Sequence, residues 1–539
     1  MRNQIGGYAM EFFEKHDLAA AILLYDLPLW RLRAIERVQL SQAFWSERER
    51  IIHVHPLREA MARDTNPETP IRNELVRLGA WAQPNIELVL PITELPKVPL
   101  LDMDINVNQR PVFRVSKDDG ARIQACYLLK LAQHAGLTQE DDHPEHFLDF
   151  LTFIFFFPWY SFERTRNIFT PSILSPPDYA YLISQNEEIE EYQKLDIPAF
   201  YSQWRRIVKR IKKISGDYVL GNPISGSQNP LLSLPYFFQE LRDRARTRRN
   251  AVNRESYPCA VKITELLTHL ERLLSDAHEK GLRGDLTAKR FVSDYFSYGY
   301  RWMVFARCVV PTNEPFTIKV REKRAIYFTA HAPYQTKHTF REHLRKEAWQ
   351  NLAFADAETN HVSIRVSDVA VRIKHPQALD EQLNPLDDKH NSSPHYPDEE
   401  KSTSELYTRQ DSKRGRPERI YIKCPLRLTR VQSGMLWLTI IITAFAWVLL
   451  LVRGMPTLHP HDVPNHGAPE STVGTGLTAK DATLILVPIA FAATLLLSKV
   501  DSTLGAWVRR IRHTVLIAEL FLLLATAFLL ILVHHVKAG

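Results

Sequence analysis

The sequence contains few of the residues that build common metal, redox and nucleotide sites. Its 539 residues include 4 cysteines and 19 glycines. The cysteines form no Cys-x-x-Cys pair and lie far apart, at Cys126, Cys259, Cys308 and Cys424. This spacing indicates neither a zinc site nor a disulfide framework. A glycine share about half the usual value argues against fibrous glycine repeats and against glycine-rich nucleotide cradles.

Motifs that specify a reaction are missing as well. The chain has no Gly-x-Ser-x-Gly, His-Glu-x-x-His or protein-kinase set, and the glycines at 221–228 lack the Gly-Lys-Ser/Thr ending of a phosphate loop. The acidic and histidine residues from Glu140 to His146 would suit a hard cation, but acidic residues before a helix also cap it, which is the interpretation we favour. We therefore predict no catalytic, cofactor or metal site, with an unrecognised enzyme site as the open alternative.

Charge and the N-terminal sequence restrict the location and the partners. The formal net charge is +7, from 68 Lys and Arg against 61 Asp and Glu. This excess is modest for the length of the chain, so no nucleic-acid partner is expected. The first residues contain no continuous apolar segment of the kind that a cleaved secretory signal requires. We expect most of the chain to lie in the cytoplasm.

Long apolar runs near the C-terminus are the strongest feature of the sequence. They cover residues 434–452, 482–498 and 514–533, whereas the mean hydropathy of the whole chain is only -0.23. Because about 20 apolar residues in a helix cross a bilayer core, the runs predict three transmembrane helices in a membrane domain at 431–539. The lipid bilayer is the first partner that the sequence predicts.

The distribution of basic residues predicts the orientation of these helices. Lys423, Arg427 and Arg430 precede the first run, and a second basic group lies between the second and third runs: Lys499, Arg509, Arg510 and Arg512. Basic residues next to membrane spans gather on the cytoplasmic side. We expect a multi-pass protein of the cell membrane with a cytoplasmic N-terminus and the C-terminus outside.

The remainder of the chain alternates between helical and strand-like patterns. We expect helices at 1–80, including one over Leu40–Met61, strands at 81–120, helices at 121–300 and strands at 301–430, with a flexible insert at 375–418. The predicted fold class is an α+β cytoplasmic region followed by three C-terminal transmembrane helices. In it, a membrane-proximal β-sandwich-like sheet carries a large helical insertion, and the last strand runs almost directly into the first membrane helix.

Three short segments resemble a known group of proteins. They are Leu90–Lys97, Asn108–Val115 and Asp356–Val366. Together with the three apolar runs, they resemble uncharacterised actinobacterial membrane proteins that have a cytoplasmic strand-rich region and C-terminal transmembrane helices. The resemblance covers about a third of the chain and implies an architecture without an activity.

One carboxylate inside the third apolar run is a candidate functional residue. Glu519 lies about six residues into this run, and a charge in lipid is expensive enough to suggest a role. Two interpretations stay open at this point. Glu519 either lines an ion or proton path, or pairs with Lys499 or Arg510 in helix association.

A basic amphipathic helix is the second candidate. Residues 201–214 place Trp204 and four apolar side chains on one face, and the other face is basic: Arg205, Arg206, Lys209, Arg210, Lys212 and Lys213. Such a face suits anionic lipid headgroups. The more ordinary alternative is a helix that packs on its own domain and exposes its basic face to water.

These features predict a membrane-anchored cytoplasmic scaffold or sensor without its own catalysis. A protein partner or a second copy of the chain would complete such a role. The alternative function is an oligomeric pore or transport component that uses Glu519.

Overall fold

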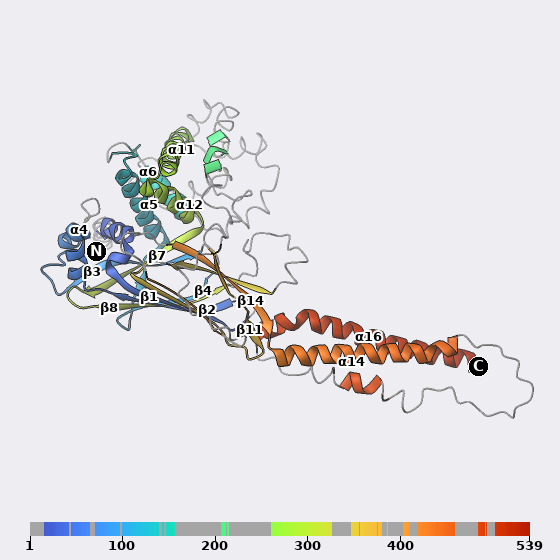
Figure 1. The fold of residues 1–539 in the computed structure, drawn as a ribbon. Helices are drawn as coiled ribbons and strands as arrows, with labels where there is room; N and C mark the ends of the chain where they lie inside the picture. The colour runs from blue at the N-terminus through green and yellow to red at the C-terminus, as the bar shows by residue number, and fades with distance from the viewer. Residues whose placement is uncertain are drawn as a thin grey trace, which may run out of the picture.

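The structure is a computed structural model with an α+β architecture. It describes residues 16–42, 45–64, 71–96, 100–139, 143–144, 147–156, 206–207, 209–211, 213–214, 260–325, 346–354, 356–374, 376–379, 385, 403–409, 418–458, 483, 485–490, 492 and 502–538. A body of packed sheets carries a group of helices on one side, and two long helices project from it together (Figure 1).

The largest sheet has seven strands in the order β13-β10-β1-β2-β8-β4-β5. It is mixed, because β1 pairs with β10 in parallel while its pairing with β2 is antiparallel. The strands are β1 (Arg31–Leu40), β2 (Trp45–Val54), β4 (Leu100–Val107), β5 (Arg110–Pro111), β8 (Phe316–Ala325), β10 (Thr359–Val366) and β13 (Thr403–Arg409).

Two smaller sheets complete the strand-rich body. In the first, β14 (Glu418–Leu428) is the centre and pairs antiparallel with β9 (Glu347–Phe354), β11 (Val371–Ile373) and β12 (Gln377–Leu379). Apolar residues of β14 and β9 pack on those of β1 and β10, which makes a sandwich with its own core. The second sheet has the order β3-β7-β6, with β3 (Asn85–Pro96), β6 (Phe113–Arg114) and β7 (Arg301–Pro311).

A helical layer is inserted between the neighbouring strands β6 and β7. Its described helices are α5 (Lys117–His134), α6 (Phe147–Phe156), α11 (Ala260–Leu282) and α12 (Leu286–Tyr300). Side-chain caps define where they start: the Ser116 hydroxyl accepts from the Asp119 amide at 3.1 Å, and Asp285 accepts from Thr287 and Ala288. Residues 16–25 form a further helix, followed by α2 (Leu27–Trp30), α3 (Leu57–Arg63) and α4 (Ile71–Arg77). Of these helices, α5, α6, α11 and α12 fall in the region where the sequence predicts a helical insertion.

Two helices are long and apolar enough to cross a membrane, α14 (Arg430–Leu458) and α16 (Thr503–Ala538). Their candidate spans are Arg430–Val452 and Thr503–Leu532, with mean hydropathies of 2.6 and 2.8. These agree with the first and third predicted spans. Among the described residues the structure therefore has two such helices, not three. The second predicted span is described only at 483, 485–490 and 492, which are helical but too few to qualify.

Two other predictions need correction. The helix predicted over Leu40–Met61 is wrong, since Trp45–Val54 is the strand β2. Its inward positions hold Arg48 and Arg50 as well as apolar residues, so the alternation of the strand was hidden in the sequence. The insert expected to be flexible at 375–418 contains two paired strands, β12 and β13. Its apolar content is low, but main-chain pairing to β14 and β10 holds these two segments.

Candidate functional site

Buried charges line the inward face of the seven-stranded sheet. Glu36 and Arg50 are cross-strand partners on β1 and β2, and their side chains meet at 2.9 Å. Arg50 also lies 2.5 Å from Asp356, at the turn that leads into β10. Two residues before Arg50 on the same face of β2, Arg48 donates to Gln350 of β9 at 2.5 Å. All of these side chains are at least nine-tenths buried, so each charge depends on its partners for stabilisation.

Arg31 extends this network toward the helical layer. Its guanidinium binds Asp356 at 2.5 Å and donates to the carbonyl of Pro91 at 2.6 Å. Burial lowers the pKa of Arg31 to about 10, against the opposing charge of Asp356. The group therefore remains protonated at neutral pH. Arg31 and Arg50 share one carboxylate, and this joins the start of β1, strand β2 and the turn before β10.

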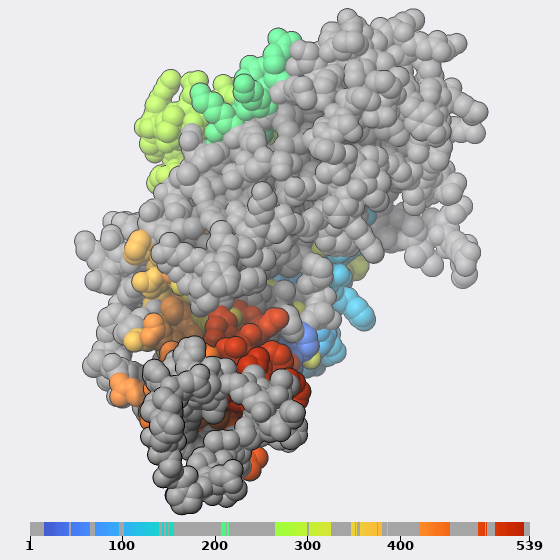
Figure 2. Space-filling view, turned by 90° about the vertical axis from the view of Figure 1, so that its right-hand side faces the viewer, coloured from blue at the N-terminus to red at the C-terminus, as the bar shows by residue number. Residues whose placement is uncertain are grey.

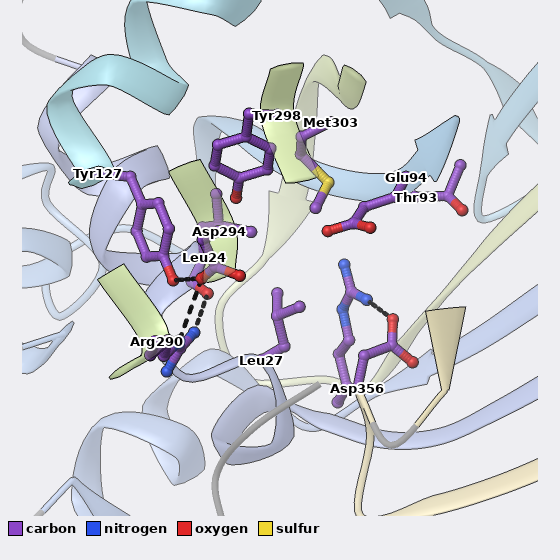
Figure 3. Close-up of a pocket in the computed structure, with 11 residues that line it drawn as sticks. Leu24, Leu27, Thr93, Glu94, Tyr127, Arg290, Asp294, Tyr298, Met303 and Asp356 are labelled. Atoms are coloured by element: carbon purple, nitrogen blue, oxygen red, sulfur yellow. Dashed lines mark hydrogen bonds and ion pairs between the residues drawn. The ribbon is translucent and has the colours of Figure 1, made fainter. Parts of the chain in front are cut away.

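A small polar cavity lies where Arg31 approaches the helices (Figure 3). On its far side, Tyr127 of α5 donates to Asp294 of α12 at 2.7 Å, and Arg290 lies 3.4 Å from the same carboxylate. Burial and the neighbouring Asp294 raise the pKa of Tyr127 well above its usual value, against the opposing charge of Arg290. Tyr127 is therefore a neutral donor in this arrangement and not a base.

The cavity is too small to bind a metabolite. Its volume is about 10 Å³, close to the space that one buried water occupies. Glu94 at its rim is paired with Arg301 at 3.3 Å, so the acids and the guanidiniums around it are matched with each other. We interpret the cavity as a junction between the seven-stranded sheet, the β3-β7-β6 sheet and the helical layer. Its chemistry is structural, because its charges are satisfied within the fold.

Reactive groups elsewhere are shielded in a similar way. Burial raises the pKa of the Cys308 and Cys424 thiols to about 12, so neither is a nucleophile in the folded protein. Within the described ranges, no group of three or more His, Cys, Asp or Glu side chains is placed to hold a metal ion.

The predicted basic amphipathic helix is described at seven of its positions. Ile207, Ile211 and Ile214 are buried in the main core. The basic side chains among these positions are exposed: Arg206, Lys209, Arg210 and Lys213. Arg210 lies 3.4 Å from Glu271 of α11, while Arg205 and Lys212 lie outside the described residues. The apolar face is thus used for packing on the protein itself, and lipid contact of the basic face stays a prediction.

The other predicted residue, Glu519, lies on the side of α16 that faces α14. It follows Leu516, which is fully buried against Ile440 of α14, and precedes the buried Leu523. Within the described part of the chain it forms no ion pair with Arg510, and one of its carboxylate oxygens is enclosed without a hydrogen-bond partner. Lys499, the other predicted partner, lies outside the described residues. The role of Glu519 stays a prediction.

A site that the sequence only partly indicated is the attachment of the two long helices. Strand β14 ends at Leu428 and α14 begins at Arg430, so Thr429 alone separates them. The Thr429 amide donates to the Ala370 carbonyl at 2.8 Å, and its own carbonyl accepts from Ser433 in the first turn of α14. Helix α14 is therefore a direct continuation of the central strand of the smaller sandwich sheet.

Helix α16 begins beside the same turn of the sandwich. Ser502 caps it, accepting from the Gly505 amide at 3.1 Å and donating to the buried carboxylate of Asp368. A Cβ at Gly505 would overlap the Asp368 carboxylate, so the absence of a side chain at this position lets the helix start approach the turn closely. Leu504 and Val508 are buried in the sandwich core. Burial of two such side chains contributes roughly 3–6 kcal/mol to holding the helix in place.

Asp368 and Ala370 thus bind both helix starts through one turn between β10 and β11, and we name residues 367–370 the coupling turn. Viewed from the side where the helices project, red atoms of α16 adjoin the orange atoms of the sandwich strands and α14 (Figure 2). From the turn, the helices run side by side in the same direction. Arg512 donates to Ser433 at 2.7 Å and Trp447 donates to Thr526 at 3.0 Å, and both pairs are 79 residues apart in the sequence.

Sequence reasoning found one half of this attachment and missed the other. The short junction at Arg430 was visible, because a strand pattern ended directly at an apolar run. The clamp of Asp368 on α16 was not visible, since the two residues that it joins are 134 positions apart. Ser502 three residues before Gly505 was the only local signal, as a helix cap.

Comparison with protein-family models, with curated proteins and with solved structures found no match for this chain. The resemblance to actinobacterial membrane proteins therefore stays a prediction.

Proposed function

We propose that this protein is a membrane-anchored scaffold or sensor in which a folded α+β domain is coupled rigidly to parallel membrane helices. One observation carries the proposal: both α14 and α16 start at the coupling turn, where Thr429 is bonded to Ala370 and Ser502 to Asp368. A simple tether needs one helix and tolerates a flexible linker. Two attachments to one turn instead make any shift of the sandwich move both helices.

The parallel direction of the helices bears on the number of membrane crossings. If α14 and α16 both leave the sandwich and cross a bilayer, the connection between them has to cross back. The predicted second span at 482–498 lies in this connection. Ala492 supports the idea, because it is fully buried in a cluster with Ile440 of α14 and Leu516 of α16. We therefore keep three crossings in the proposal, with the sandwich on one side and the C-terminus on the other.

The sidedness follows from the basic residues at the helix starts. Arg427 and Arg430 flank α14, and Arg510 and Arg512 lie in the first turns of α16, all next to the sandwich. Under the positive-inside rule, this end and the sandwich are cytoplasmic.

Spin labels test the rigid coupling in the full-length protein. One label replaces the exposed Lys323 on β8, and the other replaces the exposed Val452 near the far end of α14. Reconstituted into lipid nanodiscs, the protein should give one narrow distance distribution. A Gly-Ser-Gly-Ser insertion after Thr429 should broaden it. A broad distribution in the unmodified chain would contradict the proposal, and a Gly-Ser-Gly-Ser insertion in the Asn108–Gln109 turn serves as the control.

Topology is tested separately by thiol labelling in cells. A cysteine placed at Lys323 should react with an impermeant reagent only after the membrane is opened, whereas one placed at Lys537 should react in intact cells. Labelling of the Lys323 position in intact cells would reverse the proposed orientation.

A second candidate function is a pore or transport component that uses Glu519. It is favoured by the enclosed carboxylate oxygen of Glu519, which has no hydrogen-bond partner among the described residues, and by two buried hydroxyl residues of α14, Thr439 and Thr443. Conductance or proton flux of reconstituted protein should then fall in Glu519→Gln. An unchanged flux, or no flux in either protein, would exclude this function.

A further inference from the structure

We propose that a phosphate-bearing anionic lipid headgroup binds a basic patch at the junction of the sandwich and α16, formed by Lys346 and Arg510 beside Trp507. This inference rests on the proposed membrane location of α14 and α16. It names a ligand class that would act on the coupling turn through the helix that the turn holds.

The first step is the local geometry of the cluster. Lys346 immediately precedes β9, and its ammonium nitrogen lies 4.0 Å from the centre of the Trp507 ring. Its carbonyl accepts from the Leu426 amide of β14, so the residue is held in position by the main chain. Arg510 is exposed and lies one helical turn beyond Trp507 on the same side of α16.

The second step is that these charges are not compensated within the described residues. No ion pair joins Lys346 or Arg510 to an acid there, and Lys346 lies on the Trp507 ring instead. Two acids of this junction are engaged elsewhere, since Glu347 pairs with Lys423 at 3.2 Å and Asp368 holds Ser502. Burial and the like charge of Arg510 lower the pKa of Lys346, as expected for two cations close together without an anion.

The third step is the position of Lys346, Trp507 and Arg510 along the axes of α14 and α16, relative to the apolar part of these helices. By the offset of 79 residues between the paired helices, Trp507 is level with Leu428, and Arg512 with Ser433. The apolar part of α14 starts near Met435, and the 19 residues of the first apolar run cover about 28 Å, close to the thickness of a bilayer core. The basic side chains therefore lie within the headgroup layer.

Aromatic residues support this placement. Trp437 lies one turn into the apolar part, and Arg512 sits over its ring at 5.7 Å. Tryptophan is enriched at membrane interfaces, where its ring is apolar and its N–H is polar. Along the helices, Trp507 and Trp437 thus lie on either side of the basic residues. A phosphate between Lys346 and Arg510 would reduce the repulsion between their positive charges.

The experiment uses full-length protein in nanodiscs of phosphatidylcholine with a minor fraction of phosphatidylglycerol. After extraction into mild detergent, native mass spectrometry counts the phosphatidylglycerol that remains bound. Each basic residue near an anionic surface contributes roughly a factor of five in affinity, so Lys346→Gln with Arg510→Gln should reduce retention about twenty-five-fold. The matched control removes the same charge elsewhere on the strand-rich body, with Lys323→Gln on β8 and Arg114→Gln on β6, and should retain the lipid.

Three results would overturn the inference. Equal retention by the double variant and the control would show that the basic patch does not bind the lipid. Displacement of phosphatidylglycerol by inorganic phosphate would assign the patch to a soluble anion instead. A loss of retention in both variants would show that the net charge of the protein, and not Lys346 and Arg510 in particular, retains the lipid. Failure of the proposed function is distinguishable, because the chain would then be extracted from membranes by alkaline carbonate, before any lipid is counted.

Discussion

The cavity network and the junction of the sandwich with α16 are both rich in arginine, yet they differ in how the charge is balanced. At the cavity, Arg31 and Arg50 share Asp356, and the terminal nitrogens of each guanidinium donate to acceptors of the fold. At the junction, Lys346 and Arg510 are near each other, and no acid among the described residues binds them. Balanced charges that are sealed from water hold a fold together. Unbalanced charges at a surface are available to a partner outside it.

The largest effect is expected from breaking the balance at the cavity. Asp356→Ala leaves Arg31 and Arg50 buried next to each other without their shared carboxylate. We expect the free energy of unfolding to fall by about 3–5 kcal/mol, because an uncompensated buried charge remains. Thermal unfolding of the full-length protein in mild detergent measures the loss. The double variant Lys346→Gln with Arg510→Gln should leave the unfolding temperature unchanged, and equal losses in both would contradict the comparison.

A smaller effect is expected from crowding the attachment of α16. In Gly505→Ala the added Cβ would overlap the Asp368 carboxylate, so this carboxylate, the helix start or the coupling turn has to shift. We expect the free energy of unfolding to fall by about 1–3 kcal/mol, together with a broader distance distribution between a spin label at Lys323 and one at the exposed Phe528 of α16.

The neighbouring position provides the control for this variant. Ala506→Ser adds one atom on the exposed side of the same turn and should change neither measurement. If Gly505→Ala changes the free energy of unfolding and the distance distribution as little as Ala506→Ser does, the coupling turn does not hold α16 as described.

The smallest effect is expected on the outer face of the seven-stranded sheet, where charged side chains form ion pairs in contact with solvent. Glu49 binds Lys319 at 2.6 Å and Arg321 at 3.1 Å. Partial burial raises its pKa, but hydrogen bonds from Lys319 and Arg321 outweigh this, so the pKa lies below the ordinary value of 4.5. The stabilisation is therefore present above pH 4.5 and is lost as the pH falls below it.

Glu49→Gln should cost at most about 1 kcal/mol at neutral pH, because exposed ion pairs contribute little. The difference in unfolding temperature between Glu49→Gln and the unmodified protein should disappear in acid. A loss of stability as large as that of Asp356→Ala would show that burial does not decide how much these ion pairs contribute to the free energy of unfolding.

The sequence predicted those helices and strands in which the buried positions are occupied by apolar residues. Helices α5, α6, α11 and α12 and strands β3, β4, β7, β8 and β14 were predicted near their observed positions, because apolar residues recur there with the helical or the strand period. Strands β1 and β2 were missed. Their inward positions hold Glu36, Arg48 and Arg50, which look like solvent-facing residues until their partners are known.

The sequence by itself determined that this chain carries apolar helices of membrane length at its C-terminus, and that a strand leads directly into the first of them. Both follow from local composition, because a run of apolar residues needs no distant partner to be recognised. Only the tertiary structure decided that α14 and α16 are parallel and share the coupling turn. The tertiary structure alone also showed that the charges around Asp356 are balanced and that those around Lys346 are not. The effect of a charge on stability depends on neighbouring charges that are far away in the sequence.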